Sequence, residues 1–180
     1  MKQDYEGEKM ITGEKIILKG LTKDSASLVY EWVNREELRN LTGTLYPISE
    51  FEHEEWIKKV ALATDKKLFL ICDKETEKPI GTVGLKNFNN TINKAELFIS
   101  IGEPSYLSGG YGTDAVKTLV EYCFATLNLH KISLRVYESN ERAIKCYEKV
   151  GFIKEVTLRD EHFVDGKYEN VIVMGMLSQQ

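Results

Sequence analysis

The chain has 180 residues, of which 42% are hydrophobic and 29% are charged, and its formal net charge is −4 at pH 7. These values are typical of a globular protein that is long enough to bury a core in one domain. The acidic balance disfavours a general nucleic-acid binder, because such a protein needs a basic face to neutralise phosphates. The charge suits a cationic or amine substrate, although many cytosolic proteins of other functions carry a similar charge.

Cysteine usage and hydropathy indicate the compartment. Cys72, Cys123 and Cys146 form no C-x-x-C pair, so neither a zinc site nor a redox motif is indicated, and free buried thiols in a reducing cytosol explain them best. Residues 1–6 lack the apolar core of a signal peptide, and the longest apolar runs are too short to span a membrane. We therefore expect a cytoplasmic protein without a metal or a membrane partner.

One domain is expected over residues 14–178, preceded by a polar lead-in at 1–13. An apolar run at 15–19 predicts the first strand. Thr22 and the residues after it offer N-caps for a helix with apolar residues at helical spacing. A short helical piece is predicted at 34–40, and a third helix opens with the capping box that Ser49 begins.

The middle of the chain predicts a sheet. Three apolar runs joined by short turns are typical of an antiparallel meander, at 68–72, 80–85 and 95–101. A glycine-rich loop, a helix at 113–128 and a strand at 131–137 then complete a βαβ unit, whose two strands are parallel. The fold class is therefore α+β, with a mostly antiparallel central sheet that contains one parallel pair and is flanked by helices.

Two further elements close the chain. Asn140 can cap a helix that Gly151 ends at its C′ position. The Asp165-Gly166 dipeptide is a hairpin signal between two final strands. In a sheet of this kind, ligands favour the carboxyl ends of strands where neighbours diverge.

Three glycines lie between the strand at 95–101 and the following helix: Gly109, Gly110 and Gly112. Glycine allows positive φ angles and lets a ligand approach bare amides. A helix start also leaves about four N–H groups unpaired, with a partial positive charge. The junction therefore predicts a seat for an anion, most often a phosphate.

Three readings of this loop compete. The plainest is a tight strand-to-helix turn without a ligand. A P-loop is excluded because no Gly-Lys-Ser/Thr follows. The run from Gly110 to Ala115 fits a dinucleotide loop, with Glu138 as a ribose partner, but the strand ends several residues too early and no room remains for repeated βαβ units.

Two motifs resemble one known family. The segment Leu107-Ser-Gly-Gly-Tyr-Gly112 looks like the R/Q-x-x-G-x-G/A loop of the GNAT family of N-acetyltransferases. Residues 140–152 match that family's second signature, N-x-x-A-x-x-x-Y-x-K-x-G-F, at each specified position. The resemblance covers nearly the whole chain and is closest to the branch of ribosomal-protein and spermidine N-acetyltransferases. Leu107 departs from the pattern, because it replaces the usual Arg or Gln.

The resemblance implies that acetyl-CoA binds between the strands at 95–101 and 131–137, which splay apart. Its pyrophosphate would take the amides of residues 108–113, and its pantetheine arm would pair with the backbone near 98–101 like an added strand. Asn140 would hydrogen-bond the cofactor near its pantetheine or thioester. The implied cofactor-binding residues are Phe98, Ile99, Ser100, Ile101, Leu107, Ser108, Gly109, Gly110, Tyr111, Gly112, Thr113, Asn140, Ala143 and Tyr147.

The resemblance also assigns the chemistry, which is direct attack of an amine on the thioester. Tyr147 stands at the family's tyrosine position and is the expected general acid for the CoA thiolate; its alternative role is packing on the inner helix face. Glu96 is the expected base, acting through water, and its alternative is a structural carboxylate. A backbone N–H of the splayed strand would stabilise the oxyanion.

The expected function is transfer of acetyl from acetyl-CoA to a primary amine. A polyamine or other small amine, a protein N-terminus and an amino-sugar compound compete as acceptors, and acidic residues on the early helices lean towards a polyamine. The alternative is a non-catalytic module of the same fold that binds CoA for sensing or scaffolding. Dimers are common in the family, so a homodimer is an expectation from the resemblance.

Overall fold

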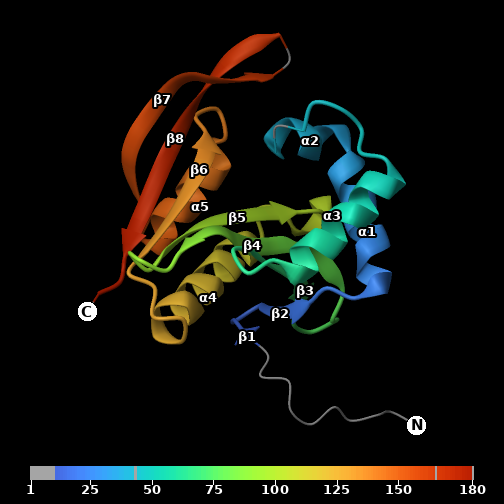
Figure 1. The fold of residues 1–180 in the computed structure, drawn as a ribbon, viewed down its shortest axis with the longest axis horizontal. Helices are drawn as coiled ribbons and strands as arrows, with labels where there is room; N and C mark the ends of the chain where they lie inside the picture. Colours follow the sequence, from blue (N-terminus) through green and yellow to red (C-terminus); the bar gives the residue numbers. More distant parts are fainter. Residues whose placement is uncertain (1–10, 43, 165, 180) are drawn as a thin grey trace.

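The computed structural model describes residues 11–42, 44–164 and 166–179 (Figure 1). Its strands are β1 Ile11–Thr12, β2 Ile16–Gly20, β3 Lys67–Asp73, β4 Pro79–Asn89, β5 Lys94–Ile101, β6 Lys131–Tyr137, β7 Ile153–Val164 and β8 Lys167–Leu177. Its helices are α1 Lys23–Asn34, α2 Glu36–Thr42, α3 Glu50–Leu62, α4 Tyr111–Ala125 and α5 Glu141–Val150, with a 3₁₀ turn at Pro104–Tyr106. No helix in these ranges is both long and apolar enough to cross a membrane.

All the strands join one sheet in the order β1-β2-β3-β4-β5-β6-β8-β7. Each neighbouring pair is antiparallel except β5 and β6, which are parallel. The parallel pair is the one that α4 connects, as the βαβ pattern requires. The predicted α+β class and the predicted meander are therefore confirmed.

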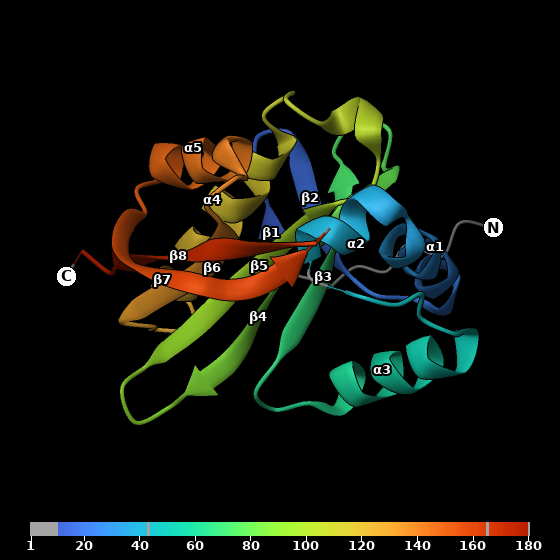
Figure 2. The ribbon, with the colours of Figure 1, turned by 90° about the horizontal axis from the view of Figure 1, so that it is seen from above.

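Helices cover both faces of the sheet (Figure 2). On one face, the apolar side of α4 packs with inward residues of β2 to β6 and with Tyr147 and Phe152 in the main core. On the other face, Val29 and Trp32 of α1 pack with Leu70 and Cys72 of β3 in a second, smaller core, to which Trp56 of α3 adds. The two cores follow from the period of two in β3, which sends alternate side chains to opposite faces.

The predicted helix caps are confirmed. Thr22 and Ser49 each accept a hydrogen bond from the backbone N–H three residues later and complete capping boxes. Asn140 accepts from the N–H of Ala143, and Gly151 ends α5 with a φ of 116°. These short-range signals place the helix starts correctly because the cap and its partner are only three residues apart.

Several boundaries differ from the expectation: α2 spans Glu36–Thr42 rather than 34–40, β4 runs to Asn89 rather than 85, and α4 ends at Ala125 rather than 128. Residues 1–10 of the lead-in lie outside the described part of the chain, whereas Ile11–Thr12 pair with β2 and so belong to the sheet. Helix α4 begins at Tyr111 rather than at 113, because Gly110 takes a left-handed conformation and serves as its N-cap. The helix therefore starts inside the glycine loop.

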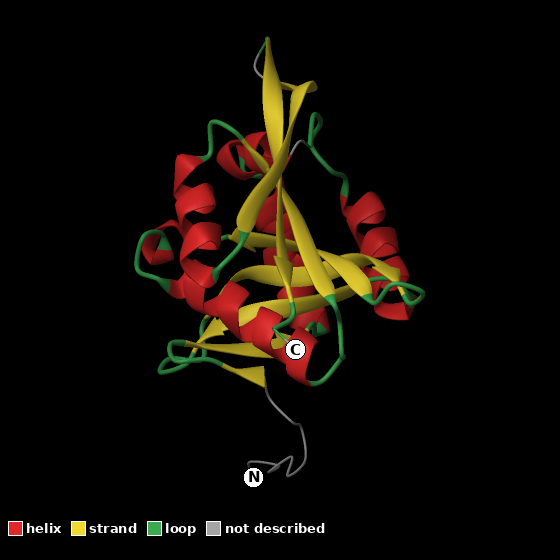
Figure 3. Cartoon of the chain, turned by 90° about the vertical axis from the view of Figure 1, so that its left-hand side faces the viewer, coloured by secondary structure: helices red, strands yellow, loops and turns green. Residues whose placement is uncertain are grey.

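Strands β7 and β8 form a long hairpin that projects from the rest of the chain (Figure 3). Val164 pairs with Lys167, which agrees with the predicted turn, although Asp165 itself lies outside the described residues. The register shifts between Leu158 and His162, and such bulges bend and twist a strand. Because of this hairpin, side chains from the end of the chain reach the site described next.

Candidate active site

Strands β5 and β6 separate partway along their length. Their residues pair only from Lys94 with Lys131 to Leu97 with Leu134. Beyond that point β5 continues to Ile101 and β6 to Tyr137 without pairing to each other. The edge of β5 that faces β6 therefore offers backbone N–H and C=O groups to a ligand, in the geometry of an added strand.

The glycine loop lies at the carboxyl end of β5. Gly110 has a φ of 85°, which an L-residue rarely adopts, and no side chain caps the start of α4. The first amides of α4 are therefore available to a ligand, and the helix dipole adds a partial positive charge there. This arrangement suits a phosphate group.

A lysine from the other end of the chain supports this loop. The Lys15 ammonium donates to the carbonyl of Gly109 at 2.9 Å and lies 5.5 Å from the centroid of the Tyr111 ring. The Asp114 carboxylate in the first turn of α4 accepts from the backbone N–H of Lys15 at 2.7 Å and of Ile16 at 3.1 Å. The ammonium group of Lys15 therefore lies beside the glycine loop, in which the side chain of Leu107 is uncharged.

One cavity of about 1320 Å³ joins the loop, the strand separation and the helices on the far face. All but two of the predicted site residues line it. Those that do are Glu96, Phe98, Ile99, Ser100, Ile101, Leu107, Ser108, Gly110, Gly112, Thr113, Asn140, Ala143 and Tyr147. Gly109 and Tyr111 do not line it. Gly109 turns its carbonyl to Lys15, and the Tyr111 ring packs against Tyr106 at 4.9 Å.

Tyr147 lies on the inner side of α5 with 7% of its surface exposed. Its ring packs edge-to-face against Phe152, with the centroids 6.0 Å apart. Burial, and secondarily the nearby Cys146 thiol, raises the pKa of the Tyr147 phenol above its ordinary value. The phenol is therefore protonated at neutral pH and has a proton to give, although the raised pKa makes it a weaker acid than a free tyrosine; the same apolar surroundings raise the basicity of a thiolate that forms beside it.

Glu96 lines the cavity, but its carboxylate already has two partners. Oε1 lies 3.1 Å from the Lys86 ammonium, and Oε2 accepts from the Asn87 amide at 3.1 Å. Lys86 stands directly opposite Glu96 in the antiparallel register, so the pair is a cross-strand ion pair. The role of base remains a prediction for Glu96, and these two bonds supply the structural role that competes with it.

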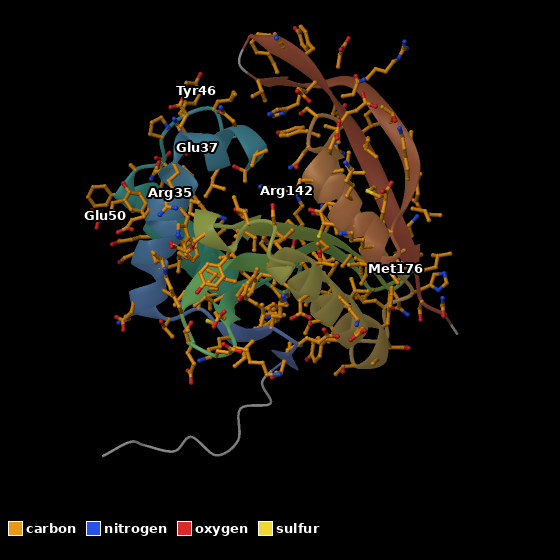
Figure 4. The ribbon with its side chains drawn as sticks, turned by 180° about the vertical axis from the view of Figure 1, so that it is seen from behind. Arg35, Glu37, Tyr46, Glu50, Arg142 and Met176 are labelled. Atoms are coloured by element: carbon orange, nitrogen blue, oxygen red, sulfur yellow. The ribbon has the colours of Figure 1, made fainter. Side chains whose placement is uncertain are left out.

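The side chain of Asn140 has a divided role. Its carbonyl oxygen accepts from Ala143 N–H at 3.2 Å and caps α5, so only its NH₂ group is left to offer a ligand as a donor. Arg142, in the same first turn, also lines the cavity (Figure 4). The amino end of α5 therefore faces the cavity with donors and positive charge.

The acidic residues of the early helices are not brought to the site. Among the described residues that line the cavity, none is one of Glu36, Glu37, Glu52, Glu54 and Glu55. Glu52 is used in the capping box of Ser49, and Glu55 pairs with Lys58 at 2.9 Å. These glutamates therefore lie on a solvated face of the helices and not on the wall of the cavity.

Sequence reasoning missed three contributors to the site: Lys15, Asp114 and His162. The two contacts of Lys15 and Asp114 join residues about a hundred positions apart, so no local pattern marks them. His162 reaches the cavity only through the long β7–β8 hairpin. No group of three or more His, Cys, Asp or Glu side chains suited to a metal occurs among the described residues.

The sequence model of one protein family, the acetyltransferase (GNAT) domain, matches residues 15–153 of this chain. This range includes the separated strands, the glycine loop and α5. The chain belongs to the GNAT family. It is 37% identical over 117 residues to the spermidine N(1)-acetyltransferase of Escherichia coli strain K12, a match that covers 65% of this chain and 61% of that protein. The Vibrio cholerae spermidine N(1)-acetyltransferase is 32% identical over 135 residues, covering 74% of this chain and 77% of the relative.

Solved structures give the same result for the fold. A crystal structure of spermidine N-acetyltransferase from Vibrio cholerae in complex with CoA and spermine superposes with a TM-score of 0.84 at 28% identity, covering 91% of this chain and 96% of that one. The mouse alpha/beta-tubulin N-acetyltransferase 9 is a further relative, 29% identical over 174 residues, covering 83% of this chain and 70% of the relative. The predicted family and branch are therefore confirmed.

Proposed function

We propose that this chain is an acetyl-CoA-dependent N-acetyltransferase that acts on a primary amine. The observation that carries the proposal is one cavity in which an open strand edge, a helix start without a side-chain cap and a buried phenol meet. These are the three groups that a phosphorylated thioester and its leaving thiolate require. Membership of the GNAT family supports the same assignment.

The residues present fit acetyl-CoA, which would supply an activated acetyl group as its thioester. The amides from Ser108 to Thr113 would hold the pyrophosphate, with charge-assisted bonds of about 1.5–3 kcal/mol each. The free edge of β5 at 98–101 would pair with the pantetheine amides. The NH₂ group of Asn140 would donate a hydrogen bond to the cofactor, and Ala143 would contact it from the wall of the same cavity.

The chain's own groups then meet three demands of the reaction. The attacking amine must be neutral, although the pKa of a free alkyl amine is about 10, so a base must take its proton. A backbone N–H of β5 near Phe98 would bind the oxyanion. Tyr147 would give its proton to the departing sulfur, since burial keeps the phenol protonated.

The acceptor is proposed to be a small primary amine. The names of the bacterial relatives support a polyamine, and the name of the tubulin acetyltransferase supports a protein acceptor. Every carboxylate among the described cavity residues already has a cation partner: Glu96 with Lys86, Glu141 with Lys145, and Glu161 with Arg135. A polyamine would therefore meet carboxylates whose charge is already partly balanced, and it would use their remaining acceptor sites.

A thiol-release assay with acetyl-CoA tests the proposal. The panel of acceptors contains spermidine, benzylamine, an amino sugar and a peptide with a free N-terminus. Release of CoA with any of them, together with the mass of the acetylated product, supports an enzyme. Calorimetry that detects acetyl-CoA binding without turnover of any amine would instead favour the non-catalytic CoA-binding module. Gly110→Val is the control, because its side chain would strain the loop and block cofactor binding.

A further inference from the structure

His162 faces the cavity from the β7–β8 hairpin. Its imidazole stacks on the ring of Tyr137, with the ring centroids 5.2 Å apart and an interplanar angle of 29°. Tyr137 is the last residue of β6, and both rings line the cavity. The imidazole is therefore held beside the strand whose separation from β5 creates the site.

The Nε2 atom of His162 is buried and has no hydrogen-bond partner among the described residues. Leaving a buried polar atom unpaired costs about 1–3 kcal/mol, so such an atom in a native protein calls for an explanation, such as a catalytic role. Glu96 differs in this respect, because both of its carboxylate oxygens already accept bonds. Of these two groups, His162 is the one that can receive a proton without breaking an existing pair.

We propose that Nε2 of His162 is the catalytic base that takes a proton from the acceptor amine. This role rests on the proposed N-acetyltransferase activity. Histidine is the side chain whose ordinary pKa allows proton exchange between about pH 5 and pH 8. A neutral imidazole also accepts the proton of an ammonium group without first losing a cation partner, as the paired Glu96 would have to do.

The proton balance of the step is complete. The ammonium form of the acceptor gives one proton to His162, which later passes it to solvent. The amine nitrogen then forms a bond to the acetyl carbon, and the C–S bond breaks with its electron pair on sulfur. Tyr147 protonates the sulfur, and the second proton lost by the nitrogen restores the phenol through solvent.

Tyr137 on β6 stacks on the imidazole, Glu169 on β8 is the register partner of His162, and Glu161 precedes it on β7. Arg135 donates to Glu161 at 2.5 Å, and Glu169 accepts from the Ser139 hydroxyl at 3.0 Å. The arginine charge is therefore balanced by its own carboxylate, and the aromatic ring of Tyr137 covers one face of the imidazole.

Two substitutions distinguish the role of the His162 nitrogen as a base from the role of its ring in stacking on Tyr137. His162→Phe keeps an aromatic ring against Tyr137 and removes the nitrogen, whereas His162→Gln removes the ring. We expect both variants to lower kcat/KM about 100-fold at pH 7 with the best amine of the panel. The deficit of His162→Phe should shrink below about ten-fold at about pH 9.5, where more of the amine is already neutral. The matched control is His130→Gln, an exposed histidine at the other end of β6.

A second measurement does not depend on turnover. Adding the amine to the protein without acetyl-CoA should shift the NMR resonance of the His162 imidazole and leave that of His130 in place. Full activity of His162→Phe, or a deficit that is the same at every pH, would overturn the role of base. A wild-type protein that binds acetyl-CoA and acetylates no amine would overturn the proposed function itself, and this role with it.

Discussion

The ammonium of Lys15 donates to the carbonyl of Gly109, two residues after the position where Leu107 replaces the family's usual charged or polar side chain. The contact joins the start of β2 to the loop that precedes α4. It places a positive charge beside the amides that are proposed to bind the pyrophosphate. The cation that this loop lacks at residue 107 is thus supplied from a segment far away in the sequence.

Lys15→Met should weaken acetyl-CoA binding. The variant removes one positive charge near the phosphates and also the bond that holds the Gly109 carbonyl. We expect a loss of about 1 kcal/mol, or about five-fold in Kd, measured by calorimetry. Lys117→Met is the control, because Lys117 lies further along α4 and pairs with Glu14 at 3.6 Å. Equal affinities of the two variants would contradict a role for Lys15 at the loop.

Leu107→Arg should strengthen binding of the same ligand, because a guanidinium can pair with a phosphate through two hydrogen bonds. Leu107 lines the cavity, so the longer side chain has space to reach the ligand. We expect Kd to fall about five-fold, and Leu107→Glu to raise it by a similar factor. The two variants introduce opposite charges at the same position, and calorimetry that gives them the same Kd would show that residue 107 does not face the phosphates.

Tyr147→Phe should lower kcat about 100-fold with little change in the affinity for acetyl-CoA, since only the proton donor is lost. Because burial raises the pKa of Tyr147, the wild-type phenol should stay protonated through about pH 10, the ordinary pKa of tyrosine. Steady-state kinetics at several pH values measure both effects, with Tyr122→Phe on α4 as the control. An unchanged kcat in Tyr147→Phe would remove this residue from the acid role.

Glu103, which follows β5, binds α1 through Trp32 and the start of β4 through Lys78. Its carboxylate accepts from the indole N–H of Trp32 at 3.0 Å and from Lys78 at 3.1 Å. These contacts lower the pKa of Glu103. The hydrogen bond from Trp32 has the largest effect, Lys78 has the next largest, and the charge of Arg35 adds a smaller one. A lowered pKa in the folded state stabilises the protein above the ordinary pKa of about 4.3, and this stabilisation is lost as the pH falls through the lowered value.

Glu103→Gln should therefore reduce stability at pH 7 by about 1 kcal/mol, and the difference from wild type should be smaller at about pH 3, below the ordinary pKa of glutamate. Urea unfolding at both pH values gives the two free energies. Glu31→Gln serves as the control, because Glu31 is exposed on the same helix as Trp32. A difference that persists undiminished at low pH would mean that the lost packing, and not the charge, accounts for the effect.

Cys146 should be the cysteine that reports cofactor binding. It lines the cavity beside Tyr147 and accepts from the Thr113 hydroxyl at 3.3 Å, whereas Cys72 and Cys123 are buried. Burial raises the pKa of the Cys146 thiol, and it raises that of Cys123 to about 12. Alkylation of the folded protein by iodoacetamide should therefore be slow at pH 8, faster at pH 9, and confined to Cys146.

Acetyl-CoA should slow this alkylation several-fold, because it would occupy the channel between α4 and α5. Peptide mass spectrometry identifies the labelled residue, and Cys146→Ser should abolish the label. Labelling of Cys146 at the same rate with and without saturating acetyl-CoA would place the cofactor elsewhere. The readout needs no turnover, so it also applies to Tyr147→Phe.

Local sequence signals predicted the part of the site that is built from contiguous segments. The glycine loop, the cap at Asn140 and the position of Tyr147 all lie in two short motifs, so their geometry depends on neighbours only a few residues away. The meander was also predictable, because its turns are short. These features need no knowledge of how distant strands pair.

The remaining contributors depend on the register of the whole sheet. Lys15 contacts Gly109 where Asp114 binds the backbone at the start of β2, and His162 stacks on Tyr137 next to a register shift between β7 and β8. The acidic residues on the early helices had two possible roles, an acceptor wall or a solvated face, and the helix orientation that places them outside the cavity decides between these roles. Neither register nor helix orientation can be deduced from periodicity alone.

The separation of β5 from β6 has a thermodynamic consequence. After Leu97 and Leu134 the two halves of the sheet have no cross-strand pairing, so beyond that point packing in the main core holds the hairpin half to the rest. A ligand that fills this gap binds the folded chain and not the unfolded one, so it raises the free energy of unfolding by RT ln(1 + [L]/Kd). At about 100 times Kd the gain is about 2.7 kcal/mol. The resistance of this protein to heat and proteolysis should therefore follow the concentration of its cofactor.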